Sequence, residues 1–338
     1  MVEIQRDISL KPYNTSNIDV NAKYFCKVKS EKDLEEMMNS PIYLNNPKLI
    51  LGSGSNILFT KDFDGLVILN RIKGANEVGS SRSLVFYSFG GGEIWDDIVK
   101  FSIGRGLSAI ENLSGIPGTV GAAAVQNIGA YGLELKDVFE SLEAVDLKSG
   151  KLKVFEKNDC RFEYRESIFK KKLLGGYIVT KVTLKLSKTF LPLINYQGIK
   201  EEIKKQNLKS SDPSEVRNVI LKLRKEKIPD YRKYGNAGCF FKNPEVSAER
   251  LNRLKASYPD MPSYQNAKGF KIPAGWLIEN LGFKGKKFGR CGVSEKHALI
   301  LVNYGGASGK EILNLALKVK SEVIRNFGIE LEFENVVV

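Results

Sequence analysis

The 338-residue sequence has a single histidine, only four cysteines and no long apolar run. Its cysteines are far apart and form no CxxC pair, which argues against a zinc ribbon or a disulfide framework: Cys26, Cys160, Cys239 and Cys291. No apolar stretch approaches the ~20 residues needed to span a bilayer, and the N-terminal residues lack the apolar block of a secretion signal. We therefore expect a cytoplasmic protein with reduced thiols, no metal and no membrane contact.

The formal net charge of +13 raises the possibility of nucleic-acid binding. The basic residues, however, are spread along the chain, and the runs KFSIGR, FKKKLL and FKGKKFGR are short. A nucleic-acid binder usually gathers its positive charge into one stripe. The pattern favours lysines that solvate the surface, with a few that attract polyanionic small molecules.

Local patterns predict an α+β protein with more than one domain. Ile94, Ile98 and Phe101 have helical spacing before Gly104 and Gly106. Residues 139–187 predict strands, with a hairpin at Ser149-Gly150 and an alternating run at Ile178, Thr180, Val182, Leu184 and Leu186. Near the end, Ser308 and Glu311 predict a capping box, Gly328 ends that helix, and IELEFE alternates as a strand would.

The loop Gly52-Ser53-Gly54-Ser55-Asn56 lies between apolar residues and invites a dinucleotide-binding interpretation. A Rossmann fingerprint needs a third glycine at a fixed offset and a helix directly after the loop. Here Ile57, Leu58 and Phe59 indicate strand or coil, so that interpretation fails. Small residues still allow backbone N–H groups and two hydroxyls to converge on one anion such as a phosphate.

A second segment, residues 114–132, is dense in glycine and alanine but also carries apolar side chains. Its small or turn-forming members are Gly115, Pro117, Gly118, Gly121, Asn127, Gly129 and Gly132, and its apolar members include Ile116, Val120, Val125 and Ile128. Backbone with very small side chains next to apolar residues suggests that a flat ligand lies against it. A tight helix–sheet contact is the alternative.

Six motifs in this order closely resemble those of the UDP-N-acetylenolpyruvoylglucosamine reductases. They are LGSGSNILF, ENLSGIPGTVGAAAVQNIGAYG, FEYRESIF, GNAGCFFKNP, PAGWLIE and VSEKHALILVN. The resemblance covers essentially the whole chain. Tyr196, in NYQGI, resembles the tyrosine-containing insertion that marks the first subtype of the family.

The resemblance implies an FAD-binding domain of the vanillyl-alcohol-oxidase (PCMH) type over residues 1–190, with a core at about 18–188, an insertion and connector over 191–226, and a substrate-binding domain over 227–338. It implies that NADPH reduces FAD, which in turn reduces the enolpyruvyl substrate, in peptidoglycan precursor synthesis. Covalent flavoproteins of this fold often attach the flavin through a histidine, and the only histidine here, His297, lies outside the FAD domain, so we expect FAD to be bound non-covalently. The pyrophosphate is expected at Gly52 to Asn56. The flavin is expected at Gly115, Ile116, Pro117, Gly118, Gly121, Asn127 and Gly129.

The resemblance also implies three catalytic residues. Arg165, in Tyr164-Arg165-Glu166-Ser167 ahead of an apolar strand, would stabilise charge on the substrate carboxylate. Cys239 stands where the family usually has serine and would donate a proton to C2, since a thiol is more acidic than an aliphatic hydroxyl. Glu334 would act as an acid beside the enolpyruvyl group, although Glu330, Glu332 and Glu334 share the polar face of IELEFE and such a face normally meets solvent.

The resemblance also implies substrate contacts: Lys227 and Asn243 match family contacts, and Tyr196 is expected to fold over the diphosphate. Tyr164, Lys271 and His297 are further candidates, with His297 secondary because a lone histidine is more often a packing residue. We expect a monomer. Two other functions stay open from the sequence. One is an oxidase for an alcohol or sugar on the same flavin fold, which has no need of Arg165, Cys239 and Glu334 together. The other is a non-enzymatic, basic nucleic-acid binder, which would be colourless and bind DNA in a salt-sensitive manner.

Overall fold

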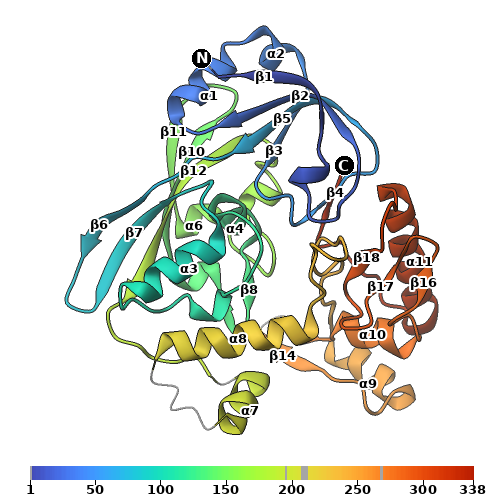
Figure 1. Cartoon of the computed structure of the whole chain (residues 1–338). Coiled ribbons are helices and arrows are strands. Elements are labelled where there is room, and N and C mark those ends of the chain that lie inside the picture. The colour runs from blue at the N-terminus through green and yellow to red at the C-terminus, as the bar shows by residue number, and fades with distance from the viewer. Residues whose placement is uncertain (1, 195, 207–211, 267–268) are drawn as a thin grey trace. The chain divides into compact units, whose positions relative to one another are not determined.

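The computed structural model describes residues 2–194, 196–206, 212–266 and 269–338, and it contains both helices and strands (Figure 1). Contacts between Cα atoms divide the chain into two compact units, and neither is continuous in sequence. Unit 1 consists of Met1–Ile8, Ala22–Ser53 and Phe63–Arg224, and unit 2 of Ser9–Asn21, Gly54–Asp62 and Lys225–Val338. Two short N-terminal segments therefore pack with the C-terminal part of the chain.

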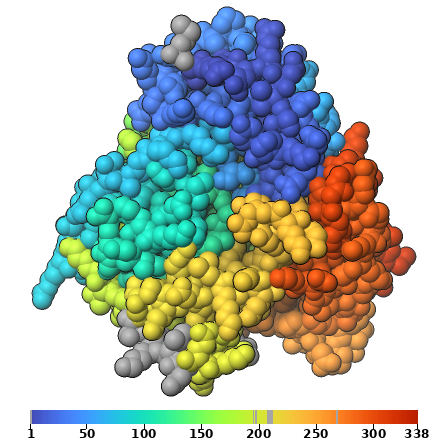
Figure 2. Space-filling view, in the orientation of Figure 1, coloured from blue at the N-terminus to red at the C-terminus, as the bar shows by residue number. Residues whose placement is uncertain are grey.

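Unit 1 contains a five-stranded antiparallel sheet in the order β11-β10-β12-β7-β6. Its strands are β6 (Ala75–Ser80), β7 (Leu84–Gly90), β10 (Phe139–Asp146), β11 (Leu152–Glu156) and β12 (Tyr177–Ser187). The β6–β7 hairpin projects from the surface of this unit (Figures 1 and 2). In β12, residues 178, 180, 182, 184 and 186 are all buried with a relative exposure of 0%. The alternation predicted from the sequence is thus confirmed, because one face of the strand lies against the core.

A second sheet has the order β1-β2-β5-β3, in which β2 and β3 both run parallel to β5. The strands are β1 (Ile4–Ser9), β2 (Asn21–Val28), β3 (Lys48–Leu51) and β5 (Phe63–Asn70). Six residues of β5 are buried, as expected for a strand between two parallel neighbours. A small two-stranded ribbon, β8 (Gly129–Ala130) with β9 (Leu133–Glu134), completes the strands of this unit.

Short helices cover these sheets. They are α1 (Glu31–Met38), α2 (Pro41–Asn45), α3 (Trp95–Gly104), α4 (Val120–Gln126), α5 (Leu135–Val138) and α6 (Lys157–Cys160), with 3-10 helices at Glu111–Leu113 and Ile168–Lys170. One hydrophobic core of this unit includes buried side chains of α3 and α4 together with those of β7, β10 and β12. Helices α7 (Gln197–Lys205) and α8 (Pro213–Lys227) pack on each other through a separate apolar cluster.

Unit 2 contains short strands and helices, of which α11 (Gly309–Phe327) is the longest with 19 residues. Its strands are β4 (Ile57–Leu58), β13 (Glu245–Val246), β14 (Tyr264–Asn266), β15 (Gly269–Lys271), β16 (Lys287–Phe288), β17 (Cys291–Val293), β18 (Leu301–Asn303) and β19 (Val336–Val337). The helices are α9 (Ala248–Ser257), α10 (Ala274–Asn280) and α11 (Gly309–Phe327), with a 3-10 helix at Lys11–Tyr13. Strands β19 and β4 pair in parallel, which joins the C-terminus to the segment after the first glycine loop.

Helix α11 confirms the predicted capping signals. Ser308 and Glu311 form both hydrogen bonds of a capping box, and Gly328 ends the helix with a φ of 63°. The expected strand at IELEFE is wrong. This segment forms only an isolated bridge between Phe241 and Phe333, and the chain bends before β19 begins at Val336. Among the helices that the structure describes, none combines the length and hydrophobicity needed to cross a lipid bilayer.

Candidate active site

Arg165 lies in a tight turn of unit 1. Glu163 and Glu166 pair across it through backbone hydrogen bonds of 3.0 and 3.2 Å, and Arg165 between them has a φ of 57°. This conformation is uncommon for a residue with a Cβ, so the surrounding contacts must stabilise it. The expectation that an apolar strand follows directly is wrong, because a 3-10 helix comes next and β12 begins only at Tyr177.

The turn is attached to the end of the glycine-rich segment. The Arg165 guanidinium donates a hydrogen bond to the Gly129 carbonyl oxygen, and Asn127 Nδ2 donates to the Glu163 carbonyl oxygen at 2.8 Å. The Arg165 guanidinium carbon lies 5.4 Å from the centroid of the Tyr164 ring. The fold therefore brings Arg165, which carries Tyr164 beside it, next to Gly129. The sequence singled out all three residues.

Part of the glycine-rich segment serves helix–sheet packing. A Cβ on Gly121, in α4, would lie 3.0 Å from the Gly91 carbonyl oxygen and 3.3 Å from the Val179 Cβ. Ala124 is fully buried on the same helix. At Gly121 the structure therefore has a tight contact between helix and sheet, which was the alternative that the sequence left open.

Asn127 ends α4 in the left-handed conformation and is fully buried. Its side chain bonds to the protein on both sides: Nδ2 donates to Glu134 Oε2 at 3.2 Å as well as to Glu163, and Oδ1 accepts from the Lys136 N–H at 3.0 Å. Asn127 therefore shapes the segment rather than presenting its amide to solvent.

The rest of the segment is a loop with accessible apolar surface. Gly115 and Gly118 have φ values of 69° and 143°, and Pro117 between them is exposed. Ile116, Val125, Ile128 and Ala130 are only partly buried against the core of unit 1. Bare backbone beside partly exposed apolar side chains is suited to a flat aromatic ligand.

The first glycine loop makes close backbone approaches. A Cβ on Gly52 would lie 2.5 Å from Thr119 Oγ1, and one on Gly54 only 2.0 Å from the Tyr13 carbonyl oxygen. Gly54 also has a φ of 61° and accepts a hydrogen bond from the Thr15 N–H at 3.1 Å. No helix follows the loop, which confirms that it is not a Rossmann turn. Ser53 and Ser55 lie in the same loop, both half-buried.

Within unit 2, Asn56 connects this loop to Glu334. Asn56 Nδ2 donates to the Glu334 carbonyl oxygen at 3.2 Å, and Asn56 Oδ1 accepts from Asn335 Nδ2 at 2.7 Å. Asn335 Nδ2 also donates to the Ala237 carbonyl oxygen at 2.8 Å. Asn56 was expected to contact a cofactor, and the structure places its amide between the loop and the segment that carries Glu334.

Cys239 and Glu334 lie on hydrogen-bonded segments of unit 2. The Glu334 N–H donates to the Phe240 carbonyl oxygen at 2.9 Å, and Phe241 bridges Phe333. Cys239 itself forms an isolated bridge with Ile300. Glu334 is half-buried, whereas Glu330 and Glu332 are exposed and bind Lys320 and Lys242. The three glutamates that share a face in the sequence therefore have different surroundings.

Cys239 also differs from the other three cysteines. Burial raises the pKa of the Cys26 and Cys160 thiols to about 12. Burial and the nearby Glu311 raise that of Cys291. Cys239 is half-buried, and none of the four forms a disulfide. The thiol that the sequence singled out is thus the one with access to a ligand.

A positive cluster surrounds His297 in unit 2. Burial is the largest cause that lowers the pKa of His297, and the nearby charges of Lys284 and Lys227 lower it further. His297 Nδ1 accepts from the Leu299 N–H at 3.2 Å, so the ring is held in place. The sequence named Lys227 and His297, but it gave no signal for Lys284, which is one lysine of many in FKGKKFGR. Lys284 binds Glu279 at 2.7 Å.

The remaining candidates occupy separate elements. Asn243 Oδ1 accepts from the Ala274 N–H at 2.9 Å at the start of α10, and Lys271 ends β15. Tyr196, at the start of α7, is 48% exposed, and its ring meets the edge of Tyr131 at 5.2 Å between centroids. Burial raises the pKa of the Tyr131 hydroxyl, which sequence reasoning had not considered.

Comparison with known proteins gives consistent matches over the whole chain. Residues 22–156 match the family model described as an FAD binding domain, and residues 230–338 match the C-terminal domain of UDP-N-acetylenolpyruvoylglucosamine reductase. The UDP-N-acetylenolpyruvoylglucosamine reductases of Pseudomonas aeruginosa and Amoebophilus asiaticus are each 42% identical to this chain, with 98% of both chains covered.

A crystal structure of the UDP-N-acetylenolpyruvylglucosamine reductase of Thermus caldophilus is similar in fold. It shares 26% identity and a TM-score of 0.68, with 100% of this chain and 98% of that chain covered.

The close approach at Gly54 leads to a prediction about stability. We expect Gly54→Ala to lower the free energy of unfolding by about 3 kcal/mol or more, because the new Cβ is both strained and pressed into backbone. Gly106→Ala is the matched control: its φ of 72° is similar, but nothing lies within 4 Å of a Cβ there. The control should cost only about 1 kcal/mol. Urea titration followed by circular dichroism measures both, and equal losses would contradict the role given to the Tyr13 contact.

Proposed function

This chain belongs to the UDP-N-acetylenolpyruvoylglucosamine reductase family, and we propose that Arg165, Cys239 and Glu334 are the residues that carry out its reaction. The enzyme is an FAD-dependent oxidoreductase that reduces the enolpyruvyl group of its UDP-sugar substrate to UDP-N-acetylmuramate, with NADPH as co-substrate, in peptidoglycan precursor synthesis. The pairing of the Cys239 and Glu334 segments within unit 2 is the observation that carries the proposal.

The described residues suit FAD. The loop at residues 115–118 and its partly buried apolar neighbours offer a surface for the flavin ring, and the loop at residues 52–56 offers backbone N–H groups for the diphosphate. When bound, FAD supplies the hydride carrier between NADPH and the enolpyruvyl carbon. The single histidine, His297, lies in unit 2 near two lysines, and we propose that the cofactor is held without a covalent bond.

The protein must supply charge and a proton. Addition of hydride to C3 of the enolpyruvyl ether places negative charge on C2 and on the substrate carboxylate. We assign Arg165 to that carboxylate because a guanidinium can donate two parallel hydrogen bonds to it. Its hydrogen bond to the Gly129 carbonyl oxygen fixes the guanidinium before substrate binds. Electrostatic stabilisation of a developing charge requires such preorganised donors.

The proton for C2 is assigned to Cys239. Its half-buried position gives it access to substrate, and a thiol is a stronger acid than an aliphatic hydroxyl. Glu334 is the companion acid, and its backbone N–H is held by the Cys239 segment. Lys227 and His297, together with Lys284, supply positive charge or hydrogen bonding for the diphosphate. Tyr164, Tyr196, Asn243 and Lys271 are assigned to the rest of the substrate.

Domain roles, location and assembly are part of the same proposal. We assign FAD binding to residues 1–190, the connector to 191–226 and substrate binding to 227–338. We also propose that the enzyme works in the cytoplasm, since its cysteines form no disulfide, and that it is a monomer. A dimer in analytical ultracentrifugation of the flavoprotein would contradict the monomer.

Replacement of Arg165 tests the charge-stabilising role. We expect Arg165→Lys to lower kcat/KM for the enolpyruvyl substrate by about 10²-fold, because lysine keeps the charge but loses the two-pronged contact. Arg161→Lys is the matched control, an exposed arginine in the same stretch of unit 1 that should stay within about twofold of the parent. Stopped-flow reduction of the substrate measures both. Equal rates for the two variants would refute the assignment.

Replacement of Cys239 tests the proton donor. Cys239→Ala should lower substrate reduction by about 10² to 10⁴-fold, the usual contribution of a general acid. Cys239→Ser should keep activity within about tenfold of the parent enzyme, because a hydroxyl group can still donate. Reduction of enzyme-bound FAD by NADPH alone should be unaffected in both. Near-normal substrate turnover by Cys239→Ala would contradict the assignment of Cys239 as the proton donor.

A further inference from the structure

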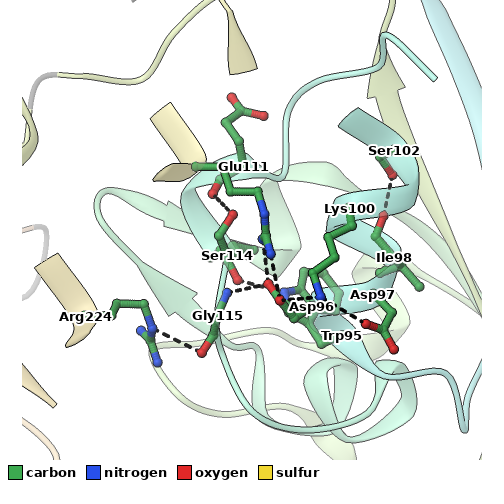
Figure 3. A network of polar contacts seen from close by, with 12 residues as sticks. Trp95, Asp96, Asp97, Ile98, Lys100, Ser102, Glu111, Ser114, Gly115 and Arg224 are labelled. Carbon is green, nitrogen blue, oxygen red and sulfur yellow. Dashed lines mark hydrogen bonds and ion pairs between the residues drawn. The ribbon is translucent and has the colours of Figure 1, made fainter. Parts of the chain in front are cut away.

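Helices α3 and α8 together hold the backbone of Gly115. Asp96, at the start of α3, accepts the Gly115 N–H at 2.6 Å, and Arg224 Nε, on α8, donates to the Gly115 carbonyl oxygen at 3.1 Å (Figure 3). Arg217, also on α8, binds Asp96 with both arms of its guanidinium at 2.6 and 2.8 Å. Both backbone polar groups of Gly115 are therefore connected to one helix.

These contacts leave Gly115 little freedom. Its φ of 69° is in the region that favours glycine, and a Cβ there would lie 2.8 Å from Leu221 Cδ2 and 3.2 Å from Arg224 Nε. The Arg217 side chain is 9% exposed and that of Asp96 22%. Two parallel hydrogen bonds between part-buried side chains fix the orientation of the two groups as well as their distance. Loss of one partner would leave the other as a poorly solvated charge.

Asp96 is itself held firmly. Burial acts to raise its pKa, but hydrogen bonds from Arg217 and Gly115 and the charges of Arg217 and Lys100 outweigh it, so the pKa lies below the ordinary value. Trp95, the preceding residue, donates from Nε1 to the Leu113 carbonyl oxygen at 3.0 Å. The carboxylate thus stays charged at neutral pH on a helix start that is anchored beside the same loop.

We propose that Arg217 and Asp96 are positioning residues that set the conformation of the Gly115–Gly118 loop for the flavin. This inference rests on the proposed contact between that loop and FAD. Neither side chain donates a proton or touches the reacting atoms in this role. They act through the Gly115 N–H, which donates to the Asp96 carboxylate that Arg217 holds. The ion pair joins residues 121 positions apart in the sequence.

Four variants test the pair. Arg217→Met keeps the length of the side chain without its charge, Arg217→Lys keeps the charge without the fork, and Asp96→Asn keeps the shape of the acceptor. Arg232→Met is the matched control, since Arg232 also binds a carboxylate, that of Asp230, with two nitrogens at 3.0 and 2.9 Å, but its side chain is 78% exposed.

The measurement is titration of each apoprotein with FAD, followed by flavin fluorescence, together with the absorption bands and midpoint potential of the FAD-saturated protein. We expect the dissociation constant for FAD to rise by about tenfold or more in Arg217→Met and Asp96→Asn, because breaking one side of a buried pair is costly. Arg217→Lys should lie between these variants and the parent. Arg232→Met should stay within about twofold of the parent. The flavin bands or the potential should shift in the first two variants.

Two results would overturn the inference. One is lower thermal stability of the apoproteins with an unchanged FAD dissociation constant, spectrum and potential, which would make the pair merely structural. The other is an equal effect of the exposed control. If Arg217→Met does not fold, the comparison of Arg217→Lys with the parent decides in the same way. Failure of the parent apoprotein to bind FAD would instead refute the proposed function.

Discussion

Backbone groups in loops need hydrogen-bond partners, and in this protein side chains from distant segments provide them. The Gly115 peptide is held by Asp96 and Arg224. The Gly129 carbonyl oxygen accepts from Arg165. The Glu334 carbonyl oxygen accepts from Asn56. A loop that carries a functional group must be solvent-accessible yet fixed, and part-buried polar partners satisfy both requirements at once.

Residues 114–132 contain small residues for two different structural reasons. In α4, glycine and alanine allow the helix to approach β12 and Gly91 closely. Just before it, Gly115 and Gly118 adopt positive φ values and leave apolar neighbours partly exposed. Small residues are needed in both parts, but for different reasons. Helix packing alone therefore accounts for only part of residues 114–132.

Regular elements could be predicted from the sequence because their patterns are local. The alternation along β12 and the capping box of α11 both follow from neighbouring residues. The pairing of Asp96 with Arg217 could not be predicted, since neither residue lies in a motif and a single sequence carries no sign of their contact. The segment IELEFE alternates correctly in burial at Ile329 and Leu331 but has too few pairing partners to form a regular strand.

The four cysteines show how burial changes the properties of one residue type. Cys26 and Cys160 are as acidic as Cys239 in a model peptide, yet burial raises the pKa of each to about 12 and leaves them as small apolar side chains. Cys239 lies between two hydrogen-bonded segments that leave it half-buried. The neighbouring Phe240 fixes this segment on both sides, since its N–H donates to the Leu299 carbonyl oxygen and its carbonyl oxygen accepts from the Glu334 N–H. Burial rather than residue type therefore distinguishes the Cys239 thiol from the two thiols in the core.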